Sequence, residues 1–380
     1  MSVPFPASGS FIKSVRESSH KARTENQISI TNESIHRLLT SPAFTQSFAR
    51  VSKSHGLSMP LKFSSPLAEL NVLAILSLLN FGSGYRVPLH EATGRGAWDS
   101  IRALVLSMYI TDEGLLAARG MQSTDVGKVA ELMRVNIHIE KPHESIPGVT
   151  VGELGGAMYE LTTLITGVLN ETGDILVGAG YPDLGTFVAQ ALELSNDAEA
   201  ILERLVRAIP AFRDMAVVNG HPIYCFKKAL FLINGIRVRF GAASSSPFPI
   251  PSTSHLPIFS DNVIPSLLVH LGVIDLSASP ILQGVFSDSH SEKKIASLLE
   301  TSDVSDRQGL SREGPKLTAE QSFVLRAAAI DACEMIVAAD ESAALGISLN
   351  DLDAWVWQIA KDRADYRQLE RFAEKGTKFF

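Results

Sequence analysis

Apolar residues at helical spacing constrain this chain more than any other feature of its sequence. They recur every three or four positions in three stretches, at residues 67–78, 200–208 and 325–336. This spacing places them on one face of an α-helix, with charged residues such as Glu203 and Arg204 left for water. A further helix is predicted over 352–361, with Asn350 or Asp351 as its N-cap. The periodicity therefore predicts a mainly α-helical protein.

One stretch indicates a β-hairpin instead. Residues 217–224 are rich in β-forming side chains and contain Asn219-Gly220 at their centre. Asn-Gly suits a tight turn whose central residues need positive φ. Pro222 has no amide hydrogen, so its strand would have to lie at an edge.

Three polar stretches interrupt the helical pattern and are expected to be loops. Residues 241–256 are rich in Ser and Pro, and residues 287–291 and 301–315 are polar or charged. Apolar helical patterns resume directly after each of them, which is typical of loops inside one domain. We expect a single domain over residues 1–380, with loop insertions at 241–256 and 301–315 and a disordered tail at 1–10.

Charge and composition exclude several classes of protein. The net charge of −7 over 380 residues argues against a surface that neutralises many phosphates. Cys225 and Cys333 both lie in apolar stretches and are expected to be buried, reduced thiols. No apolar run approaches the length of a membrane span. Met1–Ser10 lacks the charged and then apolar pattern of a secretory signal. We predict a cytoplasmic location and leave a nuclear one open.

Motifs for cofactors are absent from the sequence. Gly94-Arg95-Gly96 lacks both a third glycine and a preceding strand, so it is not a dinucleotide cradle. The ten histidines have no metal-ligand spacing. We therefore predict that no metal or organic cofactor is needed, and that carboxylates, an isolated His and a Lys pair carry any chemistry.

Short blocks along most of the chain resemble one known family. They are Phe11-Ile12, Asn80-Phe81 with His90, residues 169–173, residues 210–214, residues 226–229, residues 259–272, residues 325–327, Glu334, residues 352–357 and residues 378–380. Their order and content resemble the queuosine salvage family, the queuosine 5′-phosphate N-glycosylase/hydrolases. The resemblance implies a helical fold, by analogy similar to helix-hairpin-helix DNA glycosylases.

The reaction that the resemblance implies breaks the bond between ribose C1′ and N9 of a 7-deazaguanine. Positive charge develops on the sugar, so a carboxylate beneath C1′ stabilises the transition state or attacks it. The family's catalytic aspartate falls on Asp261. A 7-deazaguanine has no N7 to protonate, so the carboxylate and a positioned water must contribute more. From its position alone, Asp261 would be a helix cap before Ile264-Pro265.

Other family positions suggest contacts to the substrate. Phe259 resembles an aromatic residue that stacks on the base, and Asp353 resembles the acid that accepts hydrogen bonds from it. His90 resembles a ligand-contacting His. The ordinary alternatives stay open: a core Phe, a first-turn helix acid and a structural His.

The remaining substrate-binding candidates are less typical of the family. Lys227 is a candidate for the 5′-phosphate, although a Lys-Lys pair is usually a solvated helix face. Asn262 follows the catalytic position directly. Ala354 and Gln358 stand where family members can have a Tyr and a second acid, and Val324 stands where they often have a Glu. The acid that would meet the ammonium of queuine therefore has no assigned position.

The partners expected are the substrate queuosine 5′-phosphate and the product queuine, which is salvaged for tRNA modification, with no stable nucleic-acid contact and no membrane. The first alternative is a nucleic-acid glycosylase or RNA-binding protein, against which the acidic excess argues. The second is a non-catalytic helical scaffold, whose polar residues would not converge on a pocket.

Overall fold

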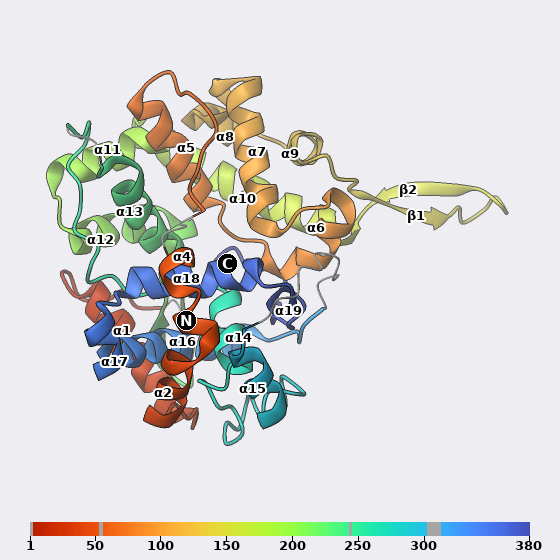
Figure 1. Ribbon diagram of the computed structural model, residues 1–380. Helices are drawn as coiled ribbons and strands as arrows, with labels where there is room; N and C mark the ends of the chain where they lie inside the picture. Colours follow the sequence, from red (N-terminus) through yellow and green to blue (C-terminus); the bar gives the residue numbers. More distant parts are fainter. Residues whose placement is uncertain (1–2, 53–55, 243–244, 302–312) are drawn as a thin grey trace. The chain divides into compact units, whose positions relative to one another are not determined.

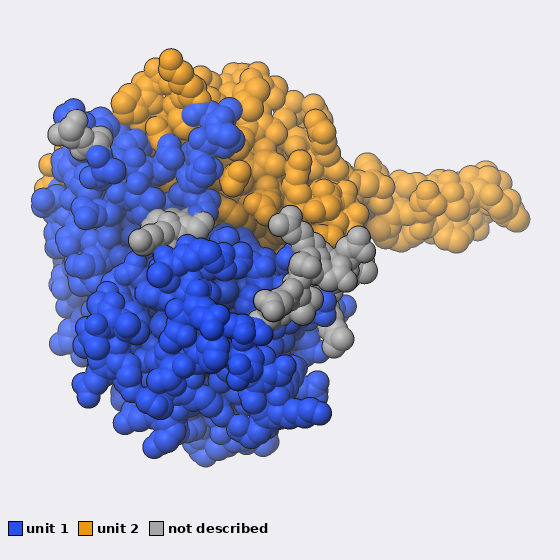
Figure 2. All heavy atoms as spheres, in the orientation of Figure 1, with its two compact units in different colours: residues 1–61, 195–204, 214–374 blue, residues 62–194, 205–213, 375–380 orange. Residues whose placement is uncertain are grey.

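The computed structural model describes residues 3–52, 56–242, 245–301 and 313–380. These residues are mainly helical, with two small antiparallel sheets of two strands each (Figure 1). The mainly α-helical prediction is therefore confirmed. Two compact units are distinguished in Figure 2 by blue and orange. Each unit draws on distant segments of the chain, and the single domain stays a prediction.

Unit 1 consists of Met1–Leu61, Ser195–Arg204 and Asp214–Glu374. Its helices are α1 (Phe11–Glu25), α2 (Asn32–Thr40), α3 (Pro42–Thr45), α4 (Phe48–Val51), α13 (Lys227–Phe240), α14 (Val263–His270), α15 (Glu292–Leu299), α16 (Ala319–Ala338), α17 (Asp340–Leu345), α18 (Leu349–Asp362) and α19 (Ala364–Arg367), and its strands are β3 (Met215–Val218) and β4 (His221–Tyr224).

Unit 2 consists of Lys62–Leu194, Leu205–Arg213 and Lys375–Phe380. Its helices are α5 (Pro66–Leu78), η1 (Ser83–Tyr85), α6 (Arg86–Thr93), α7 (Ala97–Thr111), η2 (Glu113–Leu116), α8 (Ala118–Ser123), α9 (Val126–Met133), α10 (Gly156–Gly178), α11 (Leu184–Leu194) and η3 (Pro210–Phe212), and its strands are β1 (His138–Pro142) and β2 (Thr150–Leu154). The boundary between the units falls within α12 (Ala198–Ala208).

Helix α16 is the central helix of unit 1. It begins with a capping box, in which Thr318 Oγ1 accepts the Gln321 amide and Gln321 Oε1 accepts the Thr318 amide. Helix α1 lies along α16 and is tied to it by two ion pairs. Arg16 Nε lies 2.6 Å from Glu334 Oε1, and Arg23 pairs with Asp331.

The predicted hairpin at residues 217–224 is confirmed as β3–β4, with Val218 paired to His221. Asn219 and Gly220 have φ values of 51° and 79°, which are the left-handed conformations that a tight hairpin turn needs. The two strands contact α1 and α16. Cys225, directly after β4, is free and buried, as is Cys333 in α16.

Helix α18 begins slightly earlier than the sequence indicated. Its N-cap is Ser348 rather than Asn350 or Asp351, and the Ser348 hydroxyl accepts the amide of Asp351. Within the core, Trp355 contacts Phe44 edge-on at 4.7 Å and donates its indole N–H to Ser47 Oγ. This anchors α18 against the N-terminal helices of unit 1.

Unit 2 is organised around α10, the longest of its helices. Gly173 lets α8 approach α10 closely, because a Cβ at Gly173 would lie 2.4 Å from the Gln122 amide nitrogen. Helix α5 is buried over residues 70–78. Within the described residues, no single helix is long and apolar enough to cross a bilayer. Among the same residues, α5 and residues 83–93, a pair bent by 66°, meet that test of length and composition together.

A second hairpin, β1–β2, has no counterpart in the sequence-based prediction. Both strands are exposed almost throughout, and they extend away from the helices of unit 2 (Figure 1). The pairing runs from His138 opposite Leu154 to Pro142 opposite Thr150. The sequence gives little period-2 alternation here, because neither face is buried.

The expected loops differ in outcome. Residues 241, 242 and 245–256 contain no helix or strand. Most of 301–315 lies outside the described residues. The described part of the N-terminal stretch, expected to be a disordered tail, makes specific contacts instead. Ser8 Oγ and the Gly9 amide both donate to Glu203, and the Pro4 carbonyl accepts from the Tyr224 hydroxyl.

Candidate functional site

The segment that contains Asp261 connects the irregular stretch after α13 to helix α14. Asp261 is only 7% exposed. Its Oδ1 accepts the amides of Val263 at 2.6 Å and Ile264 at 3.3 Å, as a residue just before a helix often does. Oδ2 accepts no hydrogen bond from the residues that the structure describes. One oxygen is therefore committed to the helix, and the other keeps its capacity to accept a hydrogen bond.

Asp353 reaches this segment from helix α18. Its Oδ2 accepts the backbone amide of Phe259 at 2.7 Å, although the two residues are far apart in sequence. Burial raises the pKa of Asp353 to about 7, and the charge of Asp261 adds to the rise. The Phe259 amide and the Lys227 ammonium act in the opposite direction. The structure thus brings Asp261, Asp353 and Phe259 together.

The Phe259 ring is almost fully buried. It makes an edge-to-face contact with Phe231, with ring centroids 6.0 Å apart. Asn262 is also buried, and its amide group donates to the Phe372 carbonyl at 2.8 Å. This bond ties the start of α14 to the C-terminal stretch of unit 1.

Lys227 is the first residue of helix α13 and is buried despite its charge. Burial lowers its pKa to about 8, and the charges of Asp261, Asp214 and Asp353 oppose this shift. The alternative of a solvated helix face therefore does not apply to Lys227, because its side chain lies near carboxylates inside unit 1. A buried lysine with a pKa near neutrality is frequently functional.

Arg371 is a second cation near Asp261 that the sequence analysis did not single out. It lies beyond α19 and donates from Nη2 to the Ala360 carbonyl at 2.7 Å. Burial lowers its pKa to about 10, and the charge of Asp261 counteracts this. No local pattern marks Arg371, since its relation to Asp261 exists only in the folded chain.

A buried ion pair adjoins Lys227 and the Asp261 segment. Arg326 of α16 contacts Asp214 through Nη1–Oδ1 at 2.8 Å and Nη2–Oδ2 at 2.5 Å, and neither side chain is exposed. Burial lowers the pKa of Arg326, but the charge and hydrogen bonds of Asp214, together with the nearby Cys225 and Glu374, outweigh burial and the net shift is upward. Both residues belong to blocks that carried the family resemblance, but the sequence did not indicate their pairing.

The other predicted positions have simpler surroundings. Ala354 is buried in α18 next to Asp353, and Gln358 is half-buried one turn further along the same helix face. His90 is exposed in α6 of unit 2. Its proposed contact with the substrate stays a prediction, as do those of Ala354 and Gln358.

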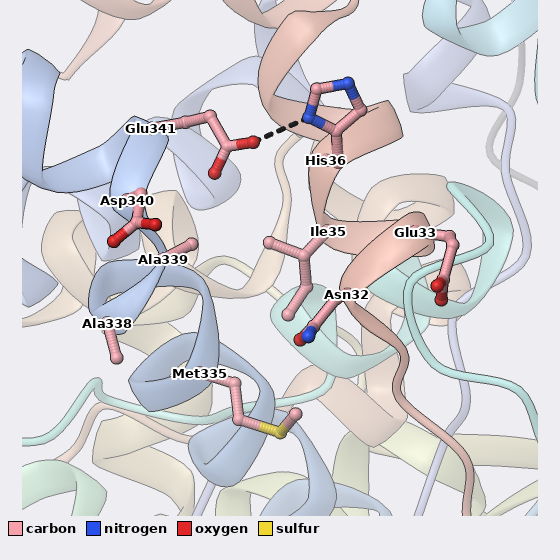
Figure 3. Close-up of a pocket in the computed structure, with 9 residues that line it drawn as sticks. All are labelled: Asn32, Glu33, Ile35, His36, Met335, Ala338, Ala339, Asp340 and Glu341. Atoms are coloured by element: carbon pink, nitrogen blue, oxygen red, sulfur yellow. Dashed lines mark hydrogen bonds and ion pairs between the residues drawn. The ribbon is translucent and has the colours of Figure 1, made fainter.

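A separate hollow of about 710 Å³ lies between α2 and the α16–α17 junction (Figure 3). Ile35 and Met335 line it together with Glu33 and Asp340, and His36 Nδ1 lies 2.6 Å from Glu341 Oε1. None of the predicted site residues lines this hollow. In the described parts of the chain, no three His, Cys, Asp or Glu side chains are grouped as metal ligands.

Two comparisons with known proteins find similar sequences. A family model described as queuosine salvage protein matches residues 156–290, which include Lys227, Phe259, Asp261 and Asn262. The queuosine 5′-phosphate N-glycosylase/hydrolase of Sphaerobacter thermophilus is 24% identical over 211 residues, which are 54% of this chain. The match spans little more than half of that relative, 57% of its length. Both matches name the family that the ordered sequence blocks resemble, and the chain is similar to queuosine salvage proteins over these segments.

Proposed function

We propose that this protein hydrolyses the N-glycosidic bond of queuosine 5′-phosphate and releases queuine. The observation that carries the proposal is the convergence of Asp261, Asp353 and Phe259 from separate segments of unit 1. A relative that is named for this reaction supports it. A cytoplasmic location, and the supply of queuine for tRNA modification, belong to the same proposal.

In this reaction Asp261 acts on the sugar. The C1′–N9 bond breaks, a water molecule gives its hydroxyl to C1′, and a proton ends on the departing base. Positive charge on the sugar is greatest in between, where a carboxylate close to C1′ lowers its energy. Oδ1 of Asp261 is held by two amides of α14, so the carboxylate is oriented before the substrate arrives.

Asp353 and Phe259 recognise the base in this proposal. A carboxylate can accept paired hydrogen bonds from the amino group and ring N–H of a guanine-like base, as acids do from base edges elsewhere. The Phe259 ring supplies an aromatic face, and stacking of this kind is worth about 1–3 kcal/mol per base. The bond from the Phe259 amide to Asp353 couples the two recognition elements.

Lys227 has two roles in this proposal, one toward the substrate phosphate and one toward a neighbouring carboxylate. We propose it as a contact to the 5′-phosphate. Its buried position near Asp353 supports an additional role, in which the ammonium lowers the pKa of the Asp353 carboxyl and favours its ionised form. His90, Asn262, Ala354 and Gln358 remain proposed substrate contacts.

The experiment is incubation of the purified protein with queuosine 5′-phosphate, with free queuine and ribose 5-phosphate detected by mass spectrometry. We expect both products in equal amounts, and the same turnover after treatment with a chelator. Queuosine-containing tRNA is tested in parallel. Release from tRNA but not from the nucleotide would favour the nucleic-acid glycosylase alternative, and no release from either would contradict the proposal.

A further inference from the structure

We propose that the buried Asp214–Arg326 pair is a positioning device, which fixes Lys227 and the Asp261 segment relative to each other. This inference rests on the proposed function, because that function places Lys227 and Asp261 in the same catalytic site. Neither Asp214 nor Arg326 is exposed, so neither is placed to touch the substrate directly. Their action must pass through the segments that they hold.

Arg326 holds the Asp261 segment. Its Nε donates to the carbonyl of Ser260, the residue directly before Asp261, at 2.9 Å. The Ser260 hydroxyl donates back to the Arg326 carbonyl at 3.0 Å. Two hydrogen bonds in opposite directions therefore fix the backbone from which the Asp261 side chain projects.

Asp214 holds the start of helix α13. Its Oδ2 accepts the Lys227 amide at 3.1 Å, and its backbone carbonyl accepts the amides of Cys225 and Phe226. A carboxylate at a helix N-terminus satisfies amides that have no partner within the helix. The direction in which Lys227 leaves the backbone is thereby set by Asp214.

The residue before Lys227 is held in a strained conformation. Phe226 has φ 47° and ψ 30°, a left-handed conformation that is costly for an aromatic residue. Its ring is fixed by contacts with Phe11 and Tyr224, at centroid distances of 5.7 and 5.6 Å. Strain of this kind persists only where the surrounding contacts fix the conformation. Asp214 provides two of these contacts, because it accepts hydrogen bonds from the backbone amides of Phe226 and Lys227.

Packing alone does not require an ion pair here. Well-packed apolar residues often replace a buried ion pair without loss of stability. Such residues could not accept the Lys227 amide or donate to the Ser260 carbonyl. What the pair supplies beyond packing is a rigid link between two segments that carry charges of opposite sign.

The test uses Arg326→Lys, which keeps the positive charge but removes the double contact with Asp214 and the bond from Nε. We expect kcat per folded molecule to fall by about tenfold to a hundredfold, because small misplacements of a reacting group have effects of this size. KM should change by less than about threefold, since the groups that touch the substrate remain. The matched control is Asp331→Asn, which removes the Arg23 ion pair on the same helix, away from Ser260.

A second readout needs no substrate. We expect hydrogen exchange at the amides of Lys227, Val263 and Ile264 to accelerate in Arg326→Lys relative to Asp331→Asn at equal distance from the melting temperature. If Arg326→Lys does not fold, Asp214→Asn, which keeps the side-chain size, takes its place. A kcat within about twofold of the wild-type value would overturn the inference. Exchange rates at these amides equal to those of Asp331→Asn would also overturn the inference, independently of kcat. If the wild-type protein releases no queuine, the proposed function fails, and the exchange data alone decide the positioning role.

Discussion

Asp261 is compatible with two interpretations, a helix cap and a catalytic carboxylate. Its position before Ile264-Pro265 is typical of a helix cap, and Oδ1 does accept two amides of α14. The family resemblance implies a catalytic carboxylate, and Oδ2 remains available for that task. Capping also orients the carboxylate, so the structural role prepares the chemical one.

The substitution Asp261→Asn separates these roles. Asn ranks with Asp as a helix cap, so the melting temperature should change little. Turnover should fall by about a hundredfold or more, the scale seen when one electrostatic stabiliser is removed from an active site. Both quantities are measured on the same preparation, by queuine release and by thermal unfolding.

The control for this substitution is Asp125→Asn. Asp125 caps α9 by accepting the Lys128 amide at 2.7 Å and is an exposed residue of unit 2. It should leave turnover unchanged. Near-normal queuine release by Asp261→Asn would refute the catalytic assignment, and so would a loss of activity that only follows unfolding.

The shifted pKa values of Asp353 and Lys227 predict how activity depends on pH. Burial raises the pKa of Asp353 to about 7, so below this pH the group is increasingly protonated and cannot accept two hydrogen bonds from the base. Burial lowers the pKa of Lys227 to about 8, so above this pH its positive charge is lost. The profile of kcat/KM should therefore be bell-shaped, with limbs near these two values.

Steady-state rates between about pH 5 and pH 10 test this profile. In Asp353→Asn the acidic limb should disappear and KM should rise, because Asn offers only one acceptor oxygen and adds donors. In Lys227→Met the alkaline limb should disappear. A wild-type profile without either limb would show that neither group titrates in a step that matters.

At the scale of elements, the sequence predicts best where a local pattern and its tertiary surroundings agree. The hairpin β3–β4 was predictable because Asn219-Gly220 defines the turn and the flanks are β-formers. The helical stretches around 67–78, 200–208 and 325–336 lie in α5, α12 and α16. The start of α18 was misplaced because Asp351 participates in the cap, but as the third residue of the helix.

The hairpin β1–β2 was not predicted, and its exposure gives the reason. Its strands bury no face, so no alternation of apolar and polar residues was required. Apolar side chains remain in water along it, and Leu154 is 57% exposed. A two-stranded hairpin without a packed face is only marginally stable.

We therefore expect β1–β2 to open more often than β3–β4. Paired amides of β1–β2 should exchange with solvent at least about tenfold faster than those of β3–β4, because the latter pair packs against α1 and α16. Hydrogen exchange followed by NMR or mass spectrometry measures both hairpins in one sample, so each is the internal control of the other. Equal protection would mean that β1–β2 has a stabilising contact beyond those described.

At the scale of the whole molecule, much of the candidate site could be proposed from the sequence, but its arrangement could not. Family blocks pointed to Asp261, Phe259 and Asp353 one at a time, and only the fold joins the Phe259 amide to Asp353. No local pattern marks Arg371. Asp214 and Arg326 lie in family blocks, but their pairing has no local signal, because a contact between residues 112 positions apart depends on how the helices pack. The order of the family blocks carried more information than composition or periodicity.

Global stability should depend on His270, a buried residue at the end of α14. Nε2 donates to the Glu370 carbonyl at 2.9 Å, and Nδ1 has no hydrogen-bond partner among the described residues. A second proton would therefore be buried without an acceptor, and burial lowers the pKa of His270 to about 4. The folded state keeps this imidazole neutral at a pH where the unfolded chain protonates it.

The direction of the pH effect follows from this difference in proton binding. Between the ordinary value of 6.5 and about 4, the unfolded state binds more protons than the folded state, so stability falls as the pH falls. The stabilisation is complete above pH 6.5, and on the order of 3 kcal/mol is lost by pH 4.

The variant His270→Gln keeps a donor for the Glu370 carbonyl and has no titrating group. Its melting temperature should decline less steeply toward acid than that of the wild type. His255→Gln, at an exposed position, is the control and should retain the wild-type slope. Parallel curves for wild type and His270→Gln would show that His270 does not limit acid stability.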